Sequence, residues 1–145
     1  MDSDRYPIHF SPLQGYTDRI YRNAFAHYFG GVEVYYTPFI RVEKGALRKR
    51  DLRDIEPETN TVADLIPQIL PGSADEFRLL TDAVGEKGYR QIDINLGCPF
   101  PMIAGKHKGA GMLLYPAQVA EVLAPIAEYP EIQFSLKMRL GWENA

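Results

Sequence analysis

The chain has 145 residues, of which 46% are hydrophobic and 24% charged, and its formal net charge is −3 at pH 7. This composition is ordinary for a globular protein and excludes an overall electrostatic attraction to nucleic acid, so any contact with RNA must be local. No stretch approaches the roughly 18 consecutive apolar residues of a membrane span, which predicts that the chain has no membrane partner.

In the first half of the chain, predicted strands alternate with helices. Residues 8–13 form the first strand, and a turn leads to a helix that begins near Thr17, the expected N-cap. Residues 32–39 are rich in β-branched and aromatic side chains and form the second strand. The charged stretch 41–60 is expected to hold at most one short helix, and residues 63–70 form the third strand.

The second half of the chain continues this alternation. Ser73 and Glu76 form a capping-box pattern at the start of the clearest helix, which ends near Gly88. The remaining elements are a strand at 91–96, a long loop at 100–112, a helix from 116 to about 129 and a strand at 132–138. Such alternation predicts a parallel sheet, either a barrel or an open doubly wound sheet. No G-x-G-x-x-G motif follows the first strand, which argues against a dinucleotide-binding fold.

Cys98, the only cysteine in the chain, follows directly after the strand 91–96. A free cysteine is more often a small buried hydrophobe than a reactive group. A thiol just past the end of a strand, however, is placed in a loop where it can act on a substrate. A single cysteine also excludes an internal disulfide, a C-x-x-C redox pair and an all-cysteine metal site, so no metal centre is expected.

Several motifs around Cys98 and the other strand ends follow one another in a fixed order. They are Ser11-Pro12-Leu13-Gln14-Gly15-Tyr16-Thr17-Asp18, Pro67-Gln68-Ile69-Leu70-Pro71-Gly72, Asn95-Leu96-Gly97-Cys98-Pro99 with Gly109-Ala110-Gly111-Met112-Leu113-Leu114, and Leu136-Lys137-Met138-Arg139-Leu140-Gly141-Trp142. Together these segments resemble the signature of the tRNA-dihydrouridine synthases, flavin enzymes that reduce uridine in tRNA. The resemblance covers nearly the whole chain.

The resemblance implies an α/β fold that is the N-terminal portion of a truncated (β/α)8 TIM barrel. A complete barrel needs about 250 residues, so 145 residues suffice for about five strands. Residues 1–145 would then be a partial FMN-binding catalytic domain. The C-terminal half of the barrel and a helical tRNA-binding domain would be absent. We expect such a fragment to be inactive alone and to self-associate through its exposed sheet edges.

The resemblance also assigns the cofactor-binding residues. Gln68 and Lys137 would bind the isoalloxazine ring of FMN, with the backbone of Pro12 and Leu13 beneath it. An amide and a positive charge suit the pyrimidine edge of a flavin, which becomes anionic on reduction. Leu13 replaces the methionine that is usual in the family, a swap of similar volume. NADPH is the expected electron donor.

The resemblance assigns the chemistry of the substrate to three further residues. Reduction of uridine to 5,6-dihydrouridine needs a hydride at C6, which comes from reduced FMN, and a proton at C5, which Cys98 would supply as general acid. A thiol is mostly protonated at neutral pH and suits that role. Asn95 would orient the uracil. Arg139 is expected to bind the substrate, although a role toward the cofactor stays open.

Two groups of basic residues are candidates for contact with tRNA phosphates. One lies on the loop 100–112, which has the composition of a mobile lid, and the other follows the second strand. The groups are Lys106, His107 and Lys108, and Arg41, Lys44, Arg48, Lys49, Arg50 and Arg53.

Two other functions remain open from the sequence. One is an FMN barrel dehydrogenase that acts on free pyrimidines, and the other is a truncated, non-catalytic tRNA-binding module. The segment Met1–Tyr6 is charged and leads into no long apolar run, which predicts no signal peptide and, with the lone cysteine, a cytoplasmic location.

Overall fold

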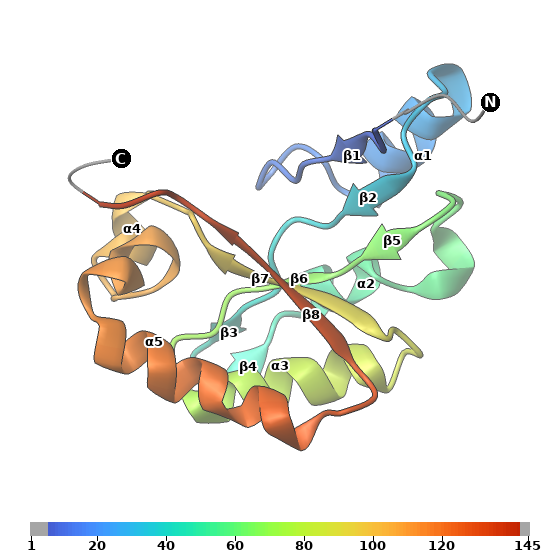
Figure 1. The fold of residues 1–145 in the computed structure, drawn as a ribbon. Helices are drawn as coiled ribbons and strands as arrows, with labels where there is room; N and C mark the ends of the chain where they lie inside the picture. Colours follow the sequence, from blue (N-terminus) through green and yellow to red (C-terminus); the bar gives the residue numbers. More distant parts are fainter. Residues whose placement is uncertain (1–5, 143–145) are drawn as a thin grey trace.

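In the computed structural model, parallel strands cross the centre of the protein and helices pack against them (Figure 1). The structure describes residues 6–142. The predicted α/β class is confirmed. Three strands form one ladder, and three form a second ladder. In order across each ladder they are β1 (His9–Phe10), β2 (Val34–Tyr36) and β5 (Leu65–Ile66), then β6 (Gln68–Ile69), β7 (Gln91–Leu96) and β8 (Gln133–Met138).

The two ladders are joined through the single residue between β5 and β6, Pro67. Proline has no N–H group to donate to a ladder, which accounts for the interruption of the predicted strand 63–70. Its carbonyl oxygen still accepts a hydrogen bond from the N–H of Asp93 at 2.9 Å. All pairings within the two ladders are parallel, and neighbours follow one another in chain order. Among the strands within residues 6–142, the order therefore shows no reversal of the kind that defines a doubly wound fold.

The main core lies between one face of this sheet and the helices α3 (Ala74–Gly85) and α5 (Pro116–Leu123), which lie side by side in Figure 1. Alternate residues of β7, Ile92, Ile94 and Leu96, are buried there against Phe77, Leu80, Val84 and Val122. Because successive side chains of a strand point to opposite faces, the residues between them face away from the helices.

Of two N-caps predicted from the sequence, one is confirmed and the other lies one residue later than predicted. Ser73 caps α3, since its hydroxyl accepts a hydrogen bond from the N–H of Glu76 at 3.2 Å. Helix α1 (Arg19–Tyr28) begins later than predicted, with Asp18 rather than Thr17 as its N-cap. The hydroxyl of Thr17 instead accepts a hydrogen bond from the N–H of Leu13 at 2.9 Å, so it closes the turn that precedes the helix.

The charged stretch 41–60 contains the expected short helix, α2 (Lys49–Asp54), and a hairpin that the sequence did not indicate. The hairpin joins β3 (Val42–Glu43) to β4 (Ala46–Leu47), and a short 3-10 turn, η1 (Pro57–Thr59), follows α2. The two central residues of the hairpin, Lys44 and Gly45, have φ angles of 51° and 76°. Such angles are typical of a two-residue hairpin turn, but lysine rarely adopts them.

The prediction of a long loop over residues 100–112 is wrong. A short helix, α4 (Pro101–Ala104), and a 3-10 helix, η2 (Gly109–Leu114), occupy most of it. Residues 109–112 are buried. A Cβ atom on Gly111 would collide with the carbonyl group of Ala104, so this glycine permits close packing of two backbones. The last helix of the chain is likewise divided, because α5 continues as the 3-10 helix η3 (Ala124–Glu128).

None of the helices within residues 6–142 is long and apolar enough to cross a membrane. The segment Met1–Tyr6, for which no signal peptide is predicted, lies outside the described residues except for Tyr6.

Candidate functional site

Polar residues line the face of the sheet that points away from α3 and α5. Gln68 on β6 pairs in register with Asp93 on β7, which pairs in turn with Ser135 on β8, and Asn95 pairs with Lys137. The exposed fractions of Gln68, Asp93 and Asn95 are 1%, 3% and 7%. Buried polar groups need hydrogen-bond partners, so their mutual contacts determine how they are oriented.

A continuous chain of hydrogen bonds connects these residues across three strands. Ser135 Oγ donates to Asp93 Oδ1 at 2.7 Å, and Gln68 Nε2 donates to Asp93 Oδ2 at 2.6 Å. Asn95 Nδ2 donates to Gln68 Oε1 at 2.8 Å. The chain therefore runs from the edge strand β8 through both carboxylate oxygens of Asp93 to the end of β7.

Asn95 also binds the loop that carries the cysteine. Its Oδ1 accepts hydrogen bonds from the N–H groups of Gly97 at 3.1 Å and Cys98 at 2.9 Å. An asparagine that binds backbone groups two and three residues ahead fixes a tight turn. The position of Cys98 just past the strand is thus set by the side chain of Asn95.

Cys98 is half-buried and packs against the apolar side chains of Phe39, Leu70 and Ile103. Its carbonyl oxygen accepts a hydrogen bond from the N–H of Ala110 at 3.0 Å. The two parts of the motif that the sequence suggested, residues 95–99 and 109–114, therefore meet in space. The cysteine is neither a fully buried core residue nor a freely exposed side chain.

The sequence patterns did not single out Ser135 or its buried partner Asp93. Burial raises the pKa of the Asp93 carboxyl group above the usual value, although hydrogen bonds from Ser135 and Gln68 and the charge of Lys137 act in the opposite direction. The sequence carries one signal for Asp93, a carboxylate between Ile92 and Ile94 in the strand predicted at 91–96. A carboxylate there shares its face with Asn95 and needs a partner.

A cavity of about 230 Å³ opens beside this network. Its lining residues are His9, Ser11, Pro12, Tyr36, Asp93, Ser135, Leu136 and Lys137. Typical ligand pockets occupy about 300–1,000 Å³, so this space suits the edge of a planar ring rather than a whole cofactor. Pro12 and Lys137, which are distant in the sequence, meet at this one cavity.

The chain matches a known protein family over nearly all of its length. The family model described as dihydrouridine synthase (Dus) matches residues 9–145. The chain belongs to the dihydrouridine synthase family.

Individual relatives agree with the family assignment. The chain is 32% identical over 141 residues to the probable tRNA-dihydrouridine synthase 2 of Bacillus subtilis, covering 92% of this chain and 41% of the relative. It is 30% identical over 138 residues to the tRNA-dihydrouridine synthase B of Pseudomonas putida, covering 93% of this chain and 40% of that relative. The chain therefore spans about two fifths of the length of the curated relatives it matches.

The structure places the residues expected from dihydrouridine synthases in different surroundings. Pro12 and Lys137 line the cavity, while Gln68 and Asn95 lie in the buried network. Leu13 is 58% exposed and does not line that cavity; its carbonyl oxygen accepts hydrogen bonds from the N–H groups of residues 16 and 17. The functional roles of all these residues stay predictions.

Arg139 lies beside the cysteine loop. Its Nε donates a hydrogen bond to the carbonyl oxygen of Gly97 at 2.9 Å, across 42 residues of sequence. A Cβ atom on Gly97 would lie 3.3 Å from the carbonyl oxygen of Lys137, so this loop also packs against the backbone of β8. The last motif of the chain thus touches the cysteine motif directly.

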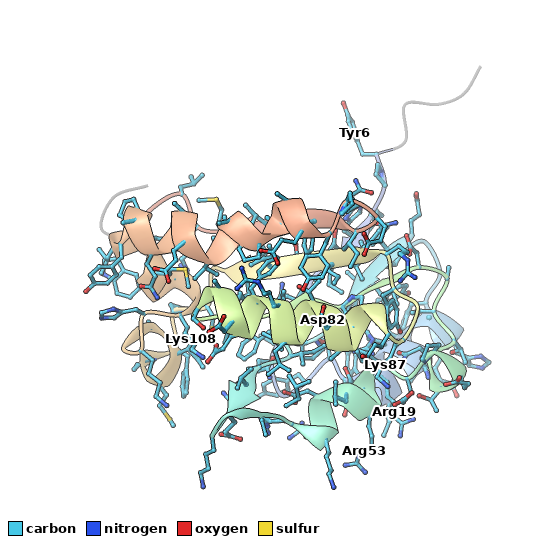
Figure 2. The ribbon with its side chains drawn as sticks, turned by 90° about the horizontal axis from the view of Figure 1, so that it is seen from below. Tyr6, Arg19, Arg53, Asp82, Lys87 and Lys108 are labelled. Carbon is cyan, nitrogen blue, oxygen red and sulfur yellow. The ribbon has the colours of Figure 1, made fainter. Side chains whose placement is uncertain are left out.

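The four arginines of the basic group that follows the second strand line a hollow next to the first and second strand ends, whereas Lys44 and Lys49 do not. This hollow has a volume of about 390 Å³ and is lined by Arg19, Arg41, Arg48, Arg50 and Arg53, together with Asp18, Asp51, Asp54 and other residues. Arg48 pairs with Glu43 and Asp51, and Arg41 also pairs with Glu43. Arg19 and Arg53 lie near one another in Figure 2.

The two basic groups meet at a second hollow of about 530 Å³, whose lining includes Arg41, Lys44, Lys106 and Lys108, the carboxylates Glu43, Asp75 and Glu76, and apolar residues. Lys108 lies at the N-terminal end of α3 (Figure 2), where its amino group pairs with Glu76 at 2.6 Å. The ring of His107 stacks on Tyr115 with centroids 4.1 Å apart.

Proposed function

We propose that the protein acts in the flavin-dependent reduction of uridine to 5,6-dihydrouridine in tRNA. Membership of the dihydrouridine synthase family supports this function. The observation that carries the proposal is the anchored position of Cys98, held by Asn95 at the end of the central strand β7. Dihydrouridine formation needs a proton donor at a fixed position, and the anchored thiol provides one.

The fold that we propose is the N-terminal portion of a (β/α)8 barrel. Parallel strands in unbroken chain order, with helices on one face and polar groups on the other, support a barrel rather than a doubly wound sheet. The carboxyl ends of the strands, where barrels carry their active sites, hold Pro12, Cys98 and Arg139. That the C-terminal half of the barrel and a helical tRNA-binding domain are absent from this chain stays a prediction.

The residues present fit a flavin. Within residues 6–142 Lys137 forms no ion pair, so its ammonium group is available to a flavin's pyrimidine edge. Both ends of the Gln68 amide bind protein partners, but an amide nitrogen carries a second N–H that can donate to the ring. The backbone at Pro12 and Leu13 would lie beneath the ring. When bound, FMN supplies the hydride for C6, with NADPH as its expected reductant.

Cys98 supplies the proton. Its S–H bond breaks as the proton passes to C5, and the resulting thiolate regains a proton from water. Asn95 holds the loop through Oδ1 and has one N–H left to orient the uracil. Arg139, bound to the carbonyl of Gly97, would neutralise charge on the base or a nearby phosphate.

Expression of the natural reading frame that contains this chain tests the proposal. With FMN and NADPH, the protein should form dihydrouridine in unmodified tRNA, detected by mass spectrometry of the nucleosides. Reduction of free uracil in place of tRNA would favour a dehydrogenase of free pyrimidines. Binding of tRNA with no reduction of either substrate would favour a non-catalytic module.

A further inference from the structure

The buried carboxylate of Asp93 has no part in the roles proposed above, yet it receives two short hydrogen bonds. Both of its oxygens are occupied, Oδ1 by the hydroxyl of Ser135 and Oδ2 by the amide nitrogen of Gln68. An ionised carboxylate only accepts hydrogen bonds. It therefore fixes which end of the Gln68 amide faces it.

The orientation of Gln68 determines the next contact. With Nε2 turned toward Asp93, Oε1 faces Asn95 and accepts from Asn95 Nδ2. That contact turns Asn95 Oδ1 toward the loop, where it accepts the N–H of Cys98. If the Gln68 amide were reversed, two N–H groups would face each other at Asn95 and the anchor would have to turn. Each link in this sequence has a defined donor and acceptor, so the direction imposed by Asp93 reaches the cysteine.

We propose that Asp93 is a positioning residue that sets the place of the Cys98 thiol through Gln68 and Asn95. The consequence for protonation of uracil rests on the proposed function, but the placement of the thiol does not. An asparagine at position 93 can play the same part, since its oxygen accepts from Gln68 while its nitrogen donates to Ser135 Oγ. An alanine cannot, and leaves Gln68 Nε2 buried without an acceptor.

Alkylation of the thiol tests this proposal without cofactor or tRNA. Cys98 is the only cysteine, so the rate constant for iodoacetamide at neutral pH reports on that one side chain. Asp93→Ala should raise the rate about five-fold by releasing the loop, which corresponds to the loss of one hydrogen bond. Asp93→Asn should restore the wild-type rate. Far-UV circular dichroism confirms that each variant is folded.

Two further variants separate positioning from general destabilisation. Ser135→Ala removes a hydrogen bond to the same carboxylate but leaves the Gln68 contact intact, so it should keep the wild-type rate. Gln68→Met breaks the relay at its middle and should raise the rate as Asp93→Ala does. The double variant Asp93→Ala/Gln68→Met should show no alkylation rate above that of either single variant, because both changes break the same series of hydrogen bonds.

Unchanged alkylation in folded Asp93→Ala and Gln68→Met would overturn the proposal, as would an increase in Ser135→Ala equal to theirs. If Asp93→Ala does not fold, Gln68→Met and Asp93→Asn still decide it. A positive result together with no reduction of tRNA would leave the relay standing and remove the proposed function alone.

Discussion

At the scale of single residues, the hydrogen bonds of the candidate site differ in how far apart their partners lie in the sequence. Cys98 and Asn95 lie within one motif, and their contact spans three residues. The bonds from Gln68 to Asp93 and from Ser135 to Asp93 span 25 and 42 residues. Such partners depend on strand register, which a sequence without a known sheet order does not define. Asp93 was missed for this reason.

The raised pKa of Asp93 makes stability depend on pH. The folded state keeps the proton of this carboxyl group to a higher pH than the unfolded state, so the group's contribution to stability is greatest below its ordinary pKa and falls as the pH rises above about 4. Asp93→Asn removes this titration. The free energy of unfolding of wild type relative to Asp93→Asn, measured in urea, should therefore decrease from pH 4 toward neutrality. A constant difference would show that Asp93 has an ordinary pKa.

At the scale of elements, the two longest strands and the helix α3 were predicted well, whereas the strands predicted at 8–13, 32–39 and 63–70 form ladder pairs over only two or three residues at a time. The strand 91–96 was predicted at its observed bounds, and Ser73 at its cap. Short elements that depend on packing were not. The hairpin at residues 42–47 has the unusual turn Lys44-Gly45, and η2 forms where glycines pack against α4. The glycines within residues 100–112 suggested a loop. Composition alone does not show whether a glycine gives the backbone conformational freedom or permits two backbone segments to pack closely.

Gly111→Ala tests the close approach of η2 to α4. The added Cβ atom would meet the carbonyl group of Ala104, so the substitution should lower the free energy of unfolding by about 1–3 kcal/mol. Gly30→Ala is the matched control, since a Cβ atom at that position would have no atom within 4 Å and the substitution should change stability by less than about 0.5 kcal/mol. Equal stability of the two variants in urea unfolding would refute this packing role.

The arginine-lined hollow allows a test of tRNA binding at helix α2. Arg50 and Arg53 line the hollow and form no ion pair within residues 6–142. Charge reversal of either should weaken tRNA binding and make the slope of log affinity against log salt concentration shallower by about 0.7–0.9 for each phosphate that is no longer neutralised. Arg90→Glu is the control, because Arg90 directly precedes the N-terminal end of β7, and it should have little effect on tRNA affinity or on the salt slope. Fluorescence anisotropy at several salt concentrations measures both quantities, and equal slopes for all three variants would exclude this surface.

At the scale of the whole molecule, family membership and the α/β class are established, and the complete barrel is a proposal. Within residues 6–142, β1 pairs only with β2 and β8 only with β7, so each leaves one side without a strand partner. Leu136 and Met138 on β8 are 45% and 56% exposed. The sequence indicated these edges, because about five predicted strands are too few to close an eight-stranded barrel. It could not indicate the polar layer on the open face, which arises from the register of three strands.

Free edges predict that the 145-residue chain associates with itself. Light scattering should give a mass above that of a monomer, and Leu136→Lys on the β8 edge should shift the distribution toward monomer. Leu79→Lys, an exposed leucine on α3, should not. A stable monomer of the unmodified chain at high concentration would contradict self-association.

The proposed function requires Cys98 to protonate the uracil of a tRNA during reduction. The most direct measurement is the rate of dihydrouridine formation by the natural reading frame carrying Cys98→Ala, with Gly30→Ala, where an added Cβ atom meets nothing within 4 Å, as a folded control. We expect Cys98→Ala to lower the rate by about 10²–10⁴-fold while FMN binding persists, and Gly30→Ala to remain within a few-fold of wild type. An undiminished rate in Cys98→Ala would contradict the assignment of Cys98 as the proton donor.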